Sequence, residues 1–234
     1  VSRAYNLSFS LHLTGPLDRA PVERALAALV ARHESLRSVF APDGLSLVIR
    51  RDATVALAVE DLQALDAKSQ RERLAQLHER AVEAPFDLLH GPVFRATLIQ
   101  KGADTREILF VVHHAVCDGW STGVLMRDFH ALLEAARSGQ PAKLKPPVGI
   151  SDFVAAEHAW QQGPEAAKHK AFWLSRFASG APAMELPADH VRPPVKTTRA
   201  SRLDDVLDPA LEGDLRALAK SLGASLANVV FAAF

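Results

Sequence analysis

The sequence predicts a layered fold of the α/β or α+β sandwich class, in which strands alternate with helices. Residues 7–13 strictly alternate apolar and polar side chains, which indicates a strand with one buried face. Residues 108–112 are all apolar, which indicates a strand that is buried on both faces. Segments with helical periodicity lie between these strands, and strands interleaved with helices are typical of layered architectures.

The composition is that of an ordinary globular protein and argues against several classes of partner. Of the 234 residues, 48% are hydrophobic and 23% are charged, which allows a substantial buried core. The 27 basic and 27 acidic residues cancel, so charge gives no reason to expect nucleic acid or an anionic membrane as a partner. No apolar run approaches the roughly 20 residues of a membrane span, and the N-terminus lacks the apolar region of a signal peptide. We therefore expect a cytoplasmic protein, and the single Cys117, which cannot form an internal disulfide, fits a reducing compartment.

After the strand over residues 7–13, the sequence predicts a helix and a hairpin. The helix begins at Pro21, and its apolar residues share one face as far as about Glu34. Residues 36–40 and 45–50 have strand character, and the Pro-Asp-Gly sequence between them favours a tight turn.

The rest of the chain alternates helices and strands on both sides of a proline-containing connector over residues 140–150. A capping box at Ser69 to Glu72 predicts the start of a helix that Pro85 ends. The further elements, in chain order, are strands over 93–100 and 108–113, a helix over 121–137, helices over 152–162 and 164–178, a strand over 203–207, a helix from Asp208 and an apolar run from Ser225. Residues 181–200 show no clear period.

The two ends predict that the chain is a segment of a longer protein. The chain begins without Met, and it stops at Phe234 within an apolar run that opens at the helix cap Ser225. No Gly, Asn or basic residue follows to close such a helix. We therefore expect part of the functional unit to lie outside this sequence.

Residues 112–121 carry the side chains best suited to chemistry. His113 and His114 stand where the buried strand ends, so the sheet fixes their backbone while a side chain can point into a cavity. An imidazole suits a general base near neutral pH because its ordinary pKa is close to that pH. Since adjacent residues of a strand point to opposite faces, only one of the two histidines is expected to face a given cavity. Asp118 and Gly119 precede a helix, where Asp accepts from free N–H groups or pairs with an arginine, and Gly lets a ligand approach the backbone.

Plainer interpretations fit the same residues. A histidine at a strand end is often a core or surface residue, and Asp followed by Gly is the default sequence of a turn with a helix cap. A metal site needs converging ligands, and no third strong ligand is evident beside the two histidines and Asp118, so we predict no metal. On the residues alone, the catalytic interpretation and these alternatives stay open.

The segment His113-His114-x-x-x-Asp118-Gly119-Trp120-Ser121 resembles the signature of condensation domains of nonribosomal peptide synthetases, in the chloramphenicol acetyltransferase-like superfamily. Further segments resemble family motifs in the family's order: Tyr5-Asn6, Leu13-x-Gly15-x-Leu17-Asp18, Arg32-His33-Glu34-Ser35-Leu36-Arg37, Pro85-Phe86-Asp87-Leu88, Gly91-Pro92-x-Phe94-Arg95, Ser151-Asp152-Phe153 and Leu186-Pro187-x-Asp189. Ile150 departs from the family, which commonly has Tyr before Ser151, and this change concerns packing more than chemistry. The resemblance is specific because its motifs are collinear over nearly the whole chain.

The resemblance implies a reaction and two catalytic residues. A donor acyl or peptidyl thioester and an acceptor aminoacyl thioester would form a peptide bond in nonribosomal peptide biosynthesis, a secondary metabolism that yields antibiotics. His114, the second histidine of the motif, would deprotonate or position the acceptor amine, and Gly119 would offer its backbone N–H to the developing oxyanion. The sequence Gly119-Trp120-Ser121 after the Asp looks more like peptide-bond-forming members than epimerisation domains, and heterocyclisation domains carry an Asp in place of the first His.

Other residues would support the site by the same resemblance. His113 would be structural, as would His33. Asp118 would brace the loop through an ion pair with Arg32, with Arg37 or with an arginine outside the sequence, and the sequence does not choose among them.

The resemblance also implies partners and a division of the chain. No cofactor would be bound directly, because both substrates arrive on the phosphopantetheine arms of donor and acceptor peptidyl carrier proteins, and neighbouring synthetase domains would be further partners. Residues 1–145 would form an N-terminal lobe with the histidine motif and a mixed sheet that helices flank, and residues 146–234 would form connecting helices and the incomplete start of a C-terminal lobe. The chain alone would hold only part of the substrate tunnel and is expected to be inactive. There are two alternatives. The first is a non-catalytic module that docks carrier proteins. The second is another acyltransferase of the superfamily, which forms esters or uses a soluble thioester.

Overall fold

The structure is a computed structural model that describes residues 5–181, 187–191, 193–195 and 203–234. The chain divides into two compact units, residues 1–184 and residues 185–234. The first unit contains the sheet and the helices that cover it. The described part of the second unit contains helices α6 (Pro209–Ser221) and α7 (Leu226–Ala233).

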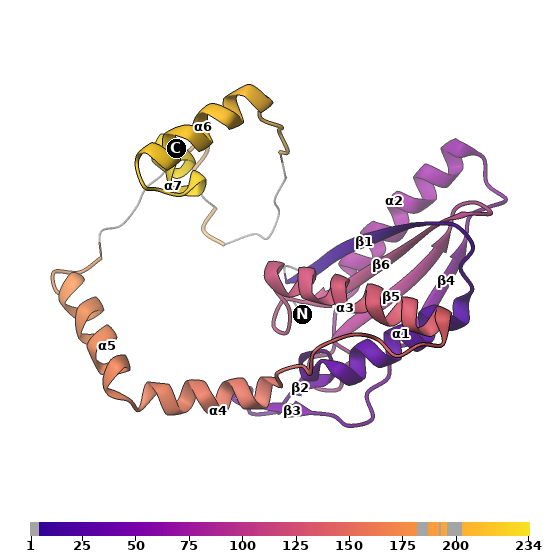
Figure 1. Cartoon of the computed structure of the whole chain (residues 1–234), viewed down its shortest axis with the longest axis horizontal. Helices are drawn as coiled ribbons and strands as arrows, with labels where there is room; N and C mark the ends of the chain where they lie inside the picture. Colours follow the sequence, from indigo (N-terminus) through magenta and orange to yellow (C-terminus); the bar gives the residue numbers. More distant parts are fainter. Residues whose placement is uncertain (1–4, 182–186, 192, 196–202) are drawn as a thin grey trace. The chain divides into compact units, whose positions relative to one another are not determined.

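A mixed four-stranded sheet forms the centre of the first unit (Figure 1). Its strands, β1 (Asn6–Thr14), β4 (Leu57–Asp61), β5 (Phe94–Gln100) and β6 (Thr105–His113), lie in the order β1-β6-β5-β4. β6 pairs antiparallel with β1 and with β5, and β5 pairs parallel with β4. β6 therefore has a neighbouring strand on each side, which satisfies its backbone groups in both directions.

Helices cover both faces of this sheet (Figure 1). α1 (Arg19–Arg32) and α3 (Gly119–Ser138) pack against one another and against one face, while α2 (Ala67–Glu83) lies on the other face. α2 also connects the parallel strands β4 and β5, which need such a crossover. The predicted layered α/β fold with a mixed sheet is confirmed.

β6 contributes to both layers of the core. Ile108, Phe110 and Val112 belong to the cluster on the side of α1 and α3, whereas Leu109 and Val111 belong to the cluster under α2. All five side chains are buried. The prediction of a strand buried on both faces is confirmed, because its continuous apolar run reflects two covered faces rather than one.

A buried carboxylate helps to hold α2 against the sheet. Glu107 of β6 accepts hydrogen bonds from Ser10 Oγ at 2.8 Å and from Lys101 Nζ at 3.0 Å, and its Oε1 lies 2.7 Å from His78 Nε2 on α2. Burial opposes the ionisation of Glu107, but the hydrogen bonds from Ser10, Lys101 and His78 outweigh it and lower the pKa of the carboxyl. The charged form is therefore the one that these contacts stabilise.

The predicted hairpin is confirmed, although both of its strands are shorter than expected. β2 (Ser38–Phe40) pairs antiparallel with β3 (Leu47–Ile49), and Gly44 takes a left-handed φ of 68° in the turn. The residues before β2 form a 3₁₀ turn, η1 (Glu34–Arg37), rather than the start of a strand. That turn is closed by a hydrogen bond from Leu36 N to His33 O.

The helix predicted from Ser69 begins earlier, so the capping box is wrong. Asp66 caps α2, since its side chain accepts from the backbone N–H groups of Lys68 and Ser69 and from Ser69 Oγ. Asp is as good an N-cap as Ser, and here it comes first in the chain. The short strand β4 was not predicted, because only Leu57 of its five residues is fully buried and the period is weak.

The helices after the connector match the prediction. α4 (Ile150–Gln161) and α5 (Pro164–Arg176) follow residues 141–149, which have no regular structure. The start of α4 is attached to η1, because Glu34 Oε2 accepts from Ser151 N at 3.1 Å and from Ser151 Oγ at 2.9 Å. Large apolar side chains on these two helices are exposed, among them Phe153, Phe172 and Trp173.

In the second unit, both helix starts are confirmed and the strand is not. Asp208 caps α6 and Ser225 caps α7 through their side-chain oxygens. Residues 203–207 form no strand, and Leu203 and Val206 are 95% and 90% exposed. A strand needs a partner for its backbone groups, and no neighbouring strand reaches this segment within the described residues. The motif residue Leu186 and parts of the loop over 181–200 lie outside the described residues.

Phe110 at the centre of the larger core cluster provides a test of this packing. Its ring lies 5.3 Å from Phe9, 5.8 Å from Phe94 and 5.2 Å from Phe129, and its side chain is fully buried. Phe110→Ala is expected to lower the free energy of unfolding by about 3–5 kcal/mol, because it leaves a cavity among three rings. Leu45→Ala, at a position 90% exposed, should change it by less than about 0.5 kcal/mol. Urea denaturation measures both, and equal effects would contradict the assigned core.

Candidate functional site

The loop between β6 and α3 holds the histidine motif, and the sheet fixes its start. His113 N donates to Val93 O at 3.0 Å, and His114 N donates to Tyr5 O at 2.7 Å. The two histidines are thus bonded to chain segments on opposite sides of β6. Residues 114–118 then turn the chain into α3, which begins at Gly119.

His113 packs into the fold. Its ring lies 6.1 Å from the ring of Phe86 and 6.2 Å from that of Tyr5, and its Nδ1 accepts from Ala115 N at 3.2 Å. Partial burial, followed by the nearby charge of His114, lowers the pKa of His113. A half-buried, neutral imidazole with an internal hydrogen bond fits a packing residue better than a proton carrier.

His114 is exposed, in contrast with its neighbour. Its ring meets the Tyr5 ring edge-on, with 6.5 Å between the ring centroids. The alternation of a strand is thus seen at its last residues, since one histidine turns toward Phe86 and the other toward solvent. Of the two imidazoles of the motif, that of His114 is the more exposed.

Asp118 and Gly119 form the start of α3. Asp118 Oδ1 accepts from Ser121 Oγ at 2.6 Å and from Ser121 N at 2.8 Å, and these two hydrogen bonds lower the pKa of the carboxyl. Gly119 is exposed, and a Cβ on it would meet no atom within 4 Å. As the first residue of the helix, Gly119 has an N–H group that no carbonyl of the helix can accept. This N–H group and the positive end of the helix dipole favour negative charge at the same place.

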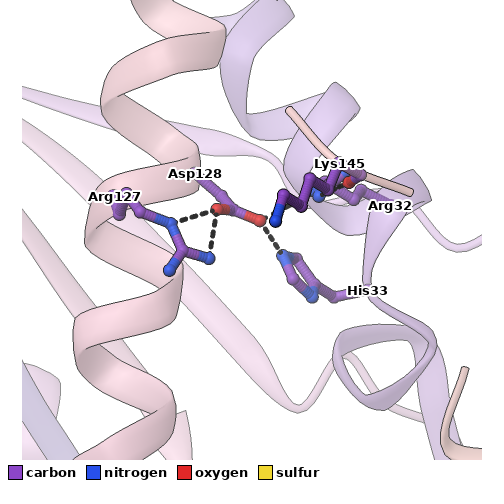
Figure 2. A network of polar contacts seen from close by, with 5 residues as sticks. All are labelled: Arg32, His33, Arg127, Asp128 and Lys145. Atoms are coloured by element: carbon purple, nitrogen blue, oxygen red, sulfur yellow. Dashed lines mark hydrogen bonds and ion pairs between the residues drawn. The ribbon is translucent and has the colours of Figure 1, made fainter. Parts of the chain in front are cut away.

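The ion pair expected between Asp118 and Arg32 or Arg37 is wrong, because both arginines have other partners. Arg32 Nε donates to Asp128 Oδ2 at 2.8 Å, and its Nη2 donates to Lys145 O (Figure 2). Arg37 Nη1 donates to Arg50 O at 2.9 Å. Asp118 Oδ1 instead accepts from Ser121 at the N-terminus of its own helix. The third alternative, an arginine outside the sequence, stays a prediction.

The buried charge of α3 is Asp128, which the sequence analysis did not single out. Its side chain is 1% exposed, and its two oxygens contact three side chains: Arg32, His33 and Arg127 (Figure 2). Arg127 Nε and Nη2 both donate to Oδ1, at 3.0 and 2.9 Å, and His33 Nε2 lies 3.1 Å from Oδ2. A signal was present in the sequence, since Asp128 lies one helical turn after the buried Leu125, on the apolar stripe of α3.

Opposite effects act on the two titratable groups of this network. Burial raises the pKa of Asp128, but hydrogen bonds and charge from Arg32 and Arg127 outweigh it and lower the pKa. Burial also lowers the pKa of His33, and the attraction of Asp128 only partly opposes this. The network thus pairs an ionised carboxylate with two guanidinium groups and a neutral imidazole.

Two further expectations concern Cys117 and metal ligands. Cys117, a residue of the histidine loop, is buried, and burial raises the pKa of its thiol, so it is a packing residue. Within the described residues, no three His, Cys, Asp or Glu side chains converge as metal ligands would.

No helix in the described part of the chain has both the length and the apolar character needed to cross a bilayer.

Comparison with known proteins identifies the family. The family model described as "Condensation domain" matches residues 1–234, the whole chain. The chain belongs to the condensation-domain family. The resemblance found in the histidine motif and its collinear companions is therefore confirmed as membership of the family.

Relatives of this condensation domain are large synthetases. The chain is 36% identical over 242 residues to chondramide synthase of Chondromyces crocatus. This match covers 100% of the chain and 6% of that protein. It is 36% identical over 224 residues to phosphinothricin tripeptide synthetase of Streptomyces viridochromogenes, covering 94% of this chain and 21% of that protein. The chain thus spans a small part of the length of these relatives.

A solved structure shares the fold. The X-domain from teicoplanin biosynthesis superposes on this condensation domain with a TM-score of 0.78 and 28% identity, over 94% of this chain and 49% of that chain. The X-domain is also known in a complex with OxyB. The fold predicted from the sequence is thus one that a solved structure shares.

The Asp128 network makes a prediction about stability and pH. Asp128→Asn is expected to lower the free energy of unfolding by about 3 kcal/mol, because Arg32 and Arg127 lose their counter-charge. The pKa of the folded carboxyl is lowered, so its contribution is present above its ordinary value of 3.8 and is lost as pH falls through the folded pKa. The difference between wild type and variant should therefore be constant near neutral pH and shrink below about pH 4.

Denaturation at a series of pH values measures this difference. Glu134→Gln is the matched control, because Glu134 is an exposed carboxylate on the same helix, and its ion-pair partner among the described residues is Arg137. An Asp128→Asn variant as stable as this control at pH 7 would show that the network does not stabilise the fold.

Proposed function

We propose that this chain carries the catalytic histidine of an enzyme that forms peptide bonds between thioesters held on carrier proteins. The observation that carries the proposal is the setting of His114. This imidazole is exposed, its backbone is bonded to Tyr5, and it lies in the loop that leads into the N-terminus of α3. A base that reacts with a substrate needs both access and a fixed position.

The proposed chemistry uses the two ends of this loop. His114 accepts a proton from the acceptor amine, or orients that amine, as its nitrogen attacks the carbonyl carbon of the donor thioester. The new C–N bond forms, the C–S bond breaks, and the proton lost by the amine goes to the leaving sulfur. The Gly119 N–H group stabilises the negative charge that develops on the carbonyl oxygen, with the helix dipole acting in the same direction.

The remaining motif residues support this loop in the proposal. Asp118 holds the start of α3 through Ser121, and His113 packs against Phe86. Arg32 acts through Asp128, and Arg37 holds the hairpin through Arg50 O. No metal and no directly bound cofactor take part, and the substrates arrive on phosphopantetheine arms.

The membership of the family supports the reaction and its partners. Relatives at 36% identity include a tripeptide synthetase, whose name describes a peptide product. We therefore propose donor and acceptor peptidyl carrier proteins and neighbouring synthetase domains as partners, in a cytoplasmic assembly that makes a secondary metabolite. Residues 1–145 are proposed as the N-terminal lobe and residues 146–234 as connecting helices with the start of a second lobe. The exposed aromatic side chains of α4 and α5 support contacts with a further part of the whole protein.

A docking module without chemistry is the second candidate. The likeness to the X-domain, which forms a complex with OxyB, favours it. Under this alternative the exposed loop of His114 would be a binding surface, so replacing the imidazole would not affect turnover of the whole protein.

His114→Ala in the whole synthetase separates the two candidates. Loss of a general base is expected to reduce peptide-bond formation by at least about 100-fold. The peptide formed on the acceptor carrier protein is measured by mass spectrometry, and carrier binding is measured by titration. His130→Ala is the matched control, because His130 is exposed on α3 and lies outside the loop. Full turnover by the His114→Ala protein, with carrier binding intact, would favour the docking module.

Gly119→Ala tests the role of the backbone at the helix start. The added Cβ meets no atom within 4 Å in the folded chain, and Ala is a better helix former than Gly, so thermal stability should not fall. A substrate carbonyl held against the Gly119 N–H group would meet that methyl group, and we expect kcat to fall by about tenfold or more. Gly123→Ala, an open position one turn along the same helix, is the control. Unchanged kcat in the Gly119→Ala protein would remove Gly119 from the proposed oxyanion site.

A further inference from the structure

Tyr5 and Asn6 form a sequence motif that the proposed reaction does not use. Tyr5 directly precedes β1, and Asn6 is the first residue of that strand, where it pairs with His113. Because β1 runs antiparallel to β6, its start lies at the end of β6, where the histidine loop begins. The motif therefore lies beside the loop, although the two are far apart in sequence.

The side chain of Asn6 fixes the start of β1. Its Nδ2 donates to Val82 O at 2.7 Å and to Ala84 O at 2.9 Å, at the end of α2. The last carbonyl groups of a helix have no donor within the helix, so the amide satisfies groups that α2 leaves open. Arg95 Nη2 donates to the same Ala84 O at 2.7 Å. The backbone next to Tyr5 is thus attached to a helix as well as to the sheet.

Tyr5 contacts His114 through its backbone and through its ring. Tyr5 O accepts from His114 N at 2.7 Å, which fixes the backbone of the histidine. The two rings meet edge-on, with 6.5 Å between their centroids and 88° between their planes. Edge-on contact is one of the preferred arrangements of aromatic pairs. The contact therefore limits where the exposed imidazole can point.

Other rings support Tyr5 from the opposite side. The centroid of the His113 ring lies 6.2 Å from that of Tyr5 and 6.1 Å from that of the buried Phe86. The guanidinium carbon of Arg95 lies 3.7 Å from the centroid of the Phe86 ring. The contacts thus run from Arg95 through Phe86, His113 and Tyr5 to His114. Tyr5 is 58% exposed, but its ring has neighbours that restrain it.

We propose that Tyr5 is a positioning residue, which selects the side-chain arrangement from which His114 meets the acceptor amine. The role rests on the proposed function of His114. A histidine side chain has three staggered χ1 positions and about two ring orientations, so about six arrangements compete. With the backbone held and the Tyr5 ring beside it, the imidazole is restricted to arrangements that keep the edge-on contact. This restriction raises the fraction of His114 that is correctly placed before the substrate arrives.

Tyr5→Leu in the whole synthetase tests this role, because it removes the ring and keeps the backbone hydrogen bond. The imidazole would then occupy the correct arrangement about three- to sixfold less often, and kcat is expected to fall by that factor. KM for the loaded carrier proteins should not change, because the ring acts on the base and not on the carrier. Tyr5→Phe keeps the ring and should restore the wild-type kcat.

Leu65→Ala is the control for this comparison, because Leu65 is an exposed apolar residue outside the loop. Wild-type kcat in the Tyr5→Leu protein would overturn the positioning role. A loss in the Tyr5→Phe protein as large as in Tyr5→Leu would also overturn it, since the hydroxyl group and not the ring would then act. A raised KM with unchanged kcat would assign Tyr5 to substrate binding instead.

The double variant Tyr5→Leu/His114→Ala shows whether Tyr5 acts through His114. Without an imidazole there is nothing to position, so the double variant should be no slower than His114→Ala alone. A further three- to sixfold loss of kcat in the double variant would mean that Tyr5 acts on the reaction independently, and the positioning role would be wrong.

NMR spectra of the histidine rings in the purified chain test the contact without any turnover. The His114 signals are identified by their absence from the His114→Ala spectrum. Tyr5→Leu is expected to shift them, because an aromatic ring changes the field at nearby protons, whereas Tyr5→Phe should leave them near their wild-type positions. Signals of His130, exposed on α3, should stay in place and show that each variant is folded. His114 signals unmoved by Tyr5→Leu would overturn the contact.

Failure of this role differs from failure of the proposed function. If His114→Ala kept full turnover, the proposed function would fail, and no catalytic role would remain for Tyr5 even if the NMR contact were present. If His114→Ala abolished turnover while Tyr5→Leu kept the wild-type kcat, only the positioning role would fail.

Discussion

The pairing of β6 between β1 and β5 is the constraint on which the rest of the first unit depends. With a strand on each side and a helical layer on each face, β6 has no freedom to shift its register without exposing Phe110 or Leu109. Its last residue therefore has a fixed place, and the hydrogen bonds of His113 and His114 extend that order into the loop. The position of the candidate catalytic imidazole is a consequence of core packing several residues before it.

Helix α3 receives a second set of constraints from charge. Its N-terminus is satisfied by Asp118, and its middle is attached to α1 and to the connector through Asp128, Arg32 and Lys145 O. Apolar contacts through Leu125 and Phe129 hold the same helix on the sheet. The two ends of the loop thus belong to elements that are fixed in different ways. Apolar burial fixes β6, whereas both apolar burial and buried ion pairs fix α3.

The Asp128 network gives Arg32 and His33, at the end of α1, a structural role. Arg32 and His33 lie far from the loop in sequence, and they act on it only through Asp128 on α3. Tyr5 and Asn6 reach the same loop from the neighbouring strand β1, through the backbone bond to His114 and the attachment of Asn6 to α2. Two early motifs are therefore joined to the histidine loop by different contacts.

The sequence by itself determined the layers, most of the elements and the family. Alternation over residues 7–13 and the apolar run of β6 predicted strands, because periodicity follows directly from which faces are buried. Local caps at Asp208 and Ser225 were also predictable, since an N-cap involves residues only a few positions apart. The short β4 and the failed strand over residues 203–207 show the limit of local patterns, because strand pairing depends on residues far away in sequence.

Only the tertiary structure decided which charges pair. From sequence, Asp118 was the carboxylate expected to pair with Arg32 or Arg37, because it belongs to the motif. In the fold, Asp118 lies against its own helix N-terminus, whereas Asp128 is enclosed between α1 and α3. An ion pair requires atoms within about 4 Å and exclusion of competing water, and both conditions come from the packing of elements distant in the chain. For the same reason the contact between the rings of Tyr5 and His114 had no signature in the sequence, since only the pairing of β1 with β6 brings the two residues together.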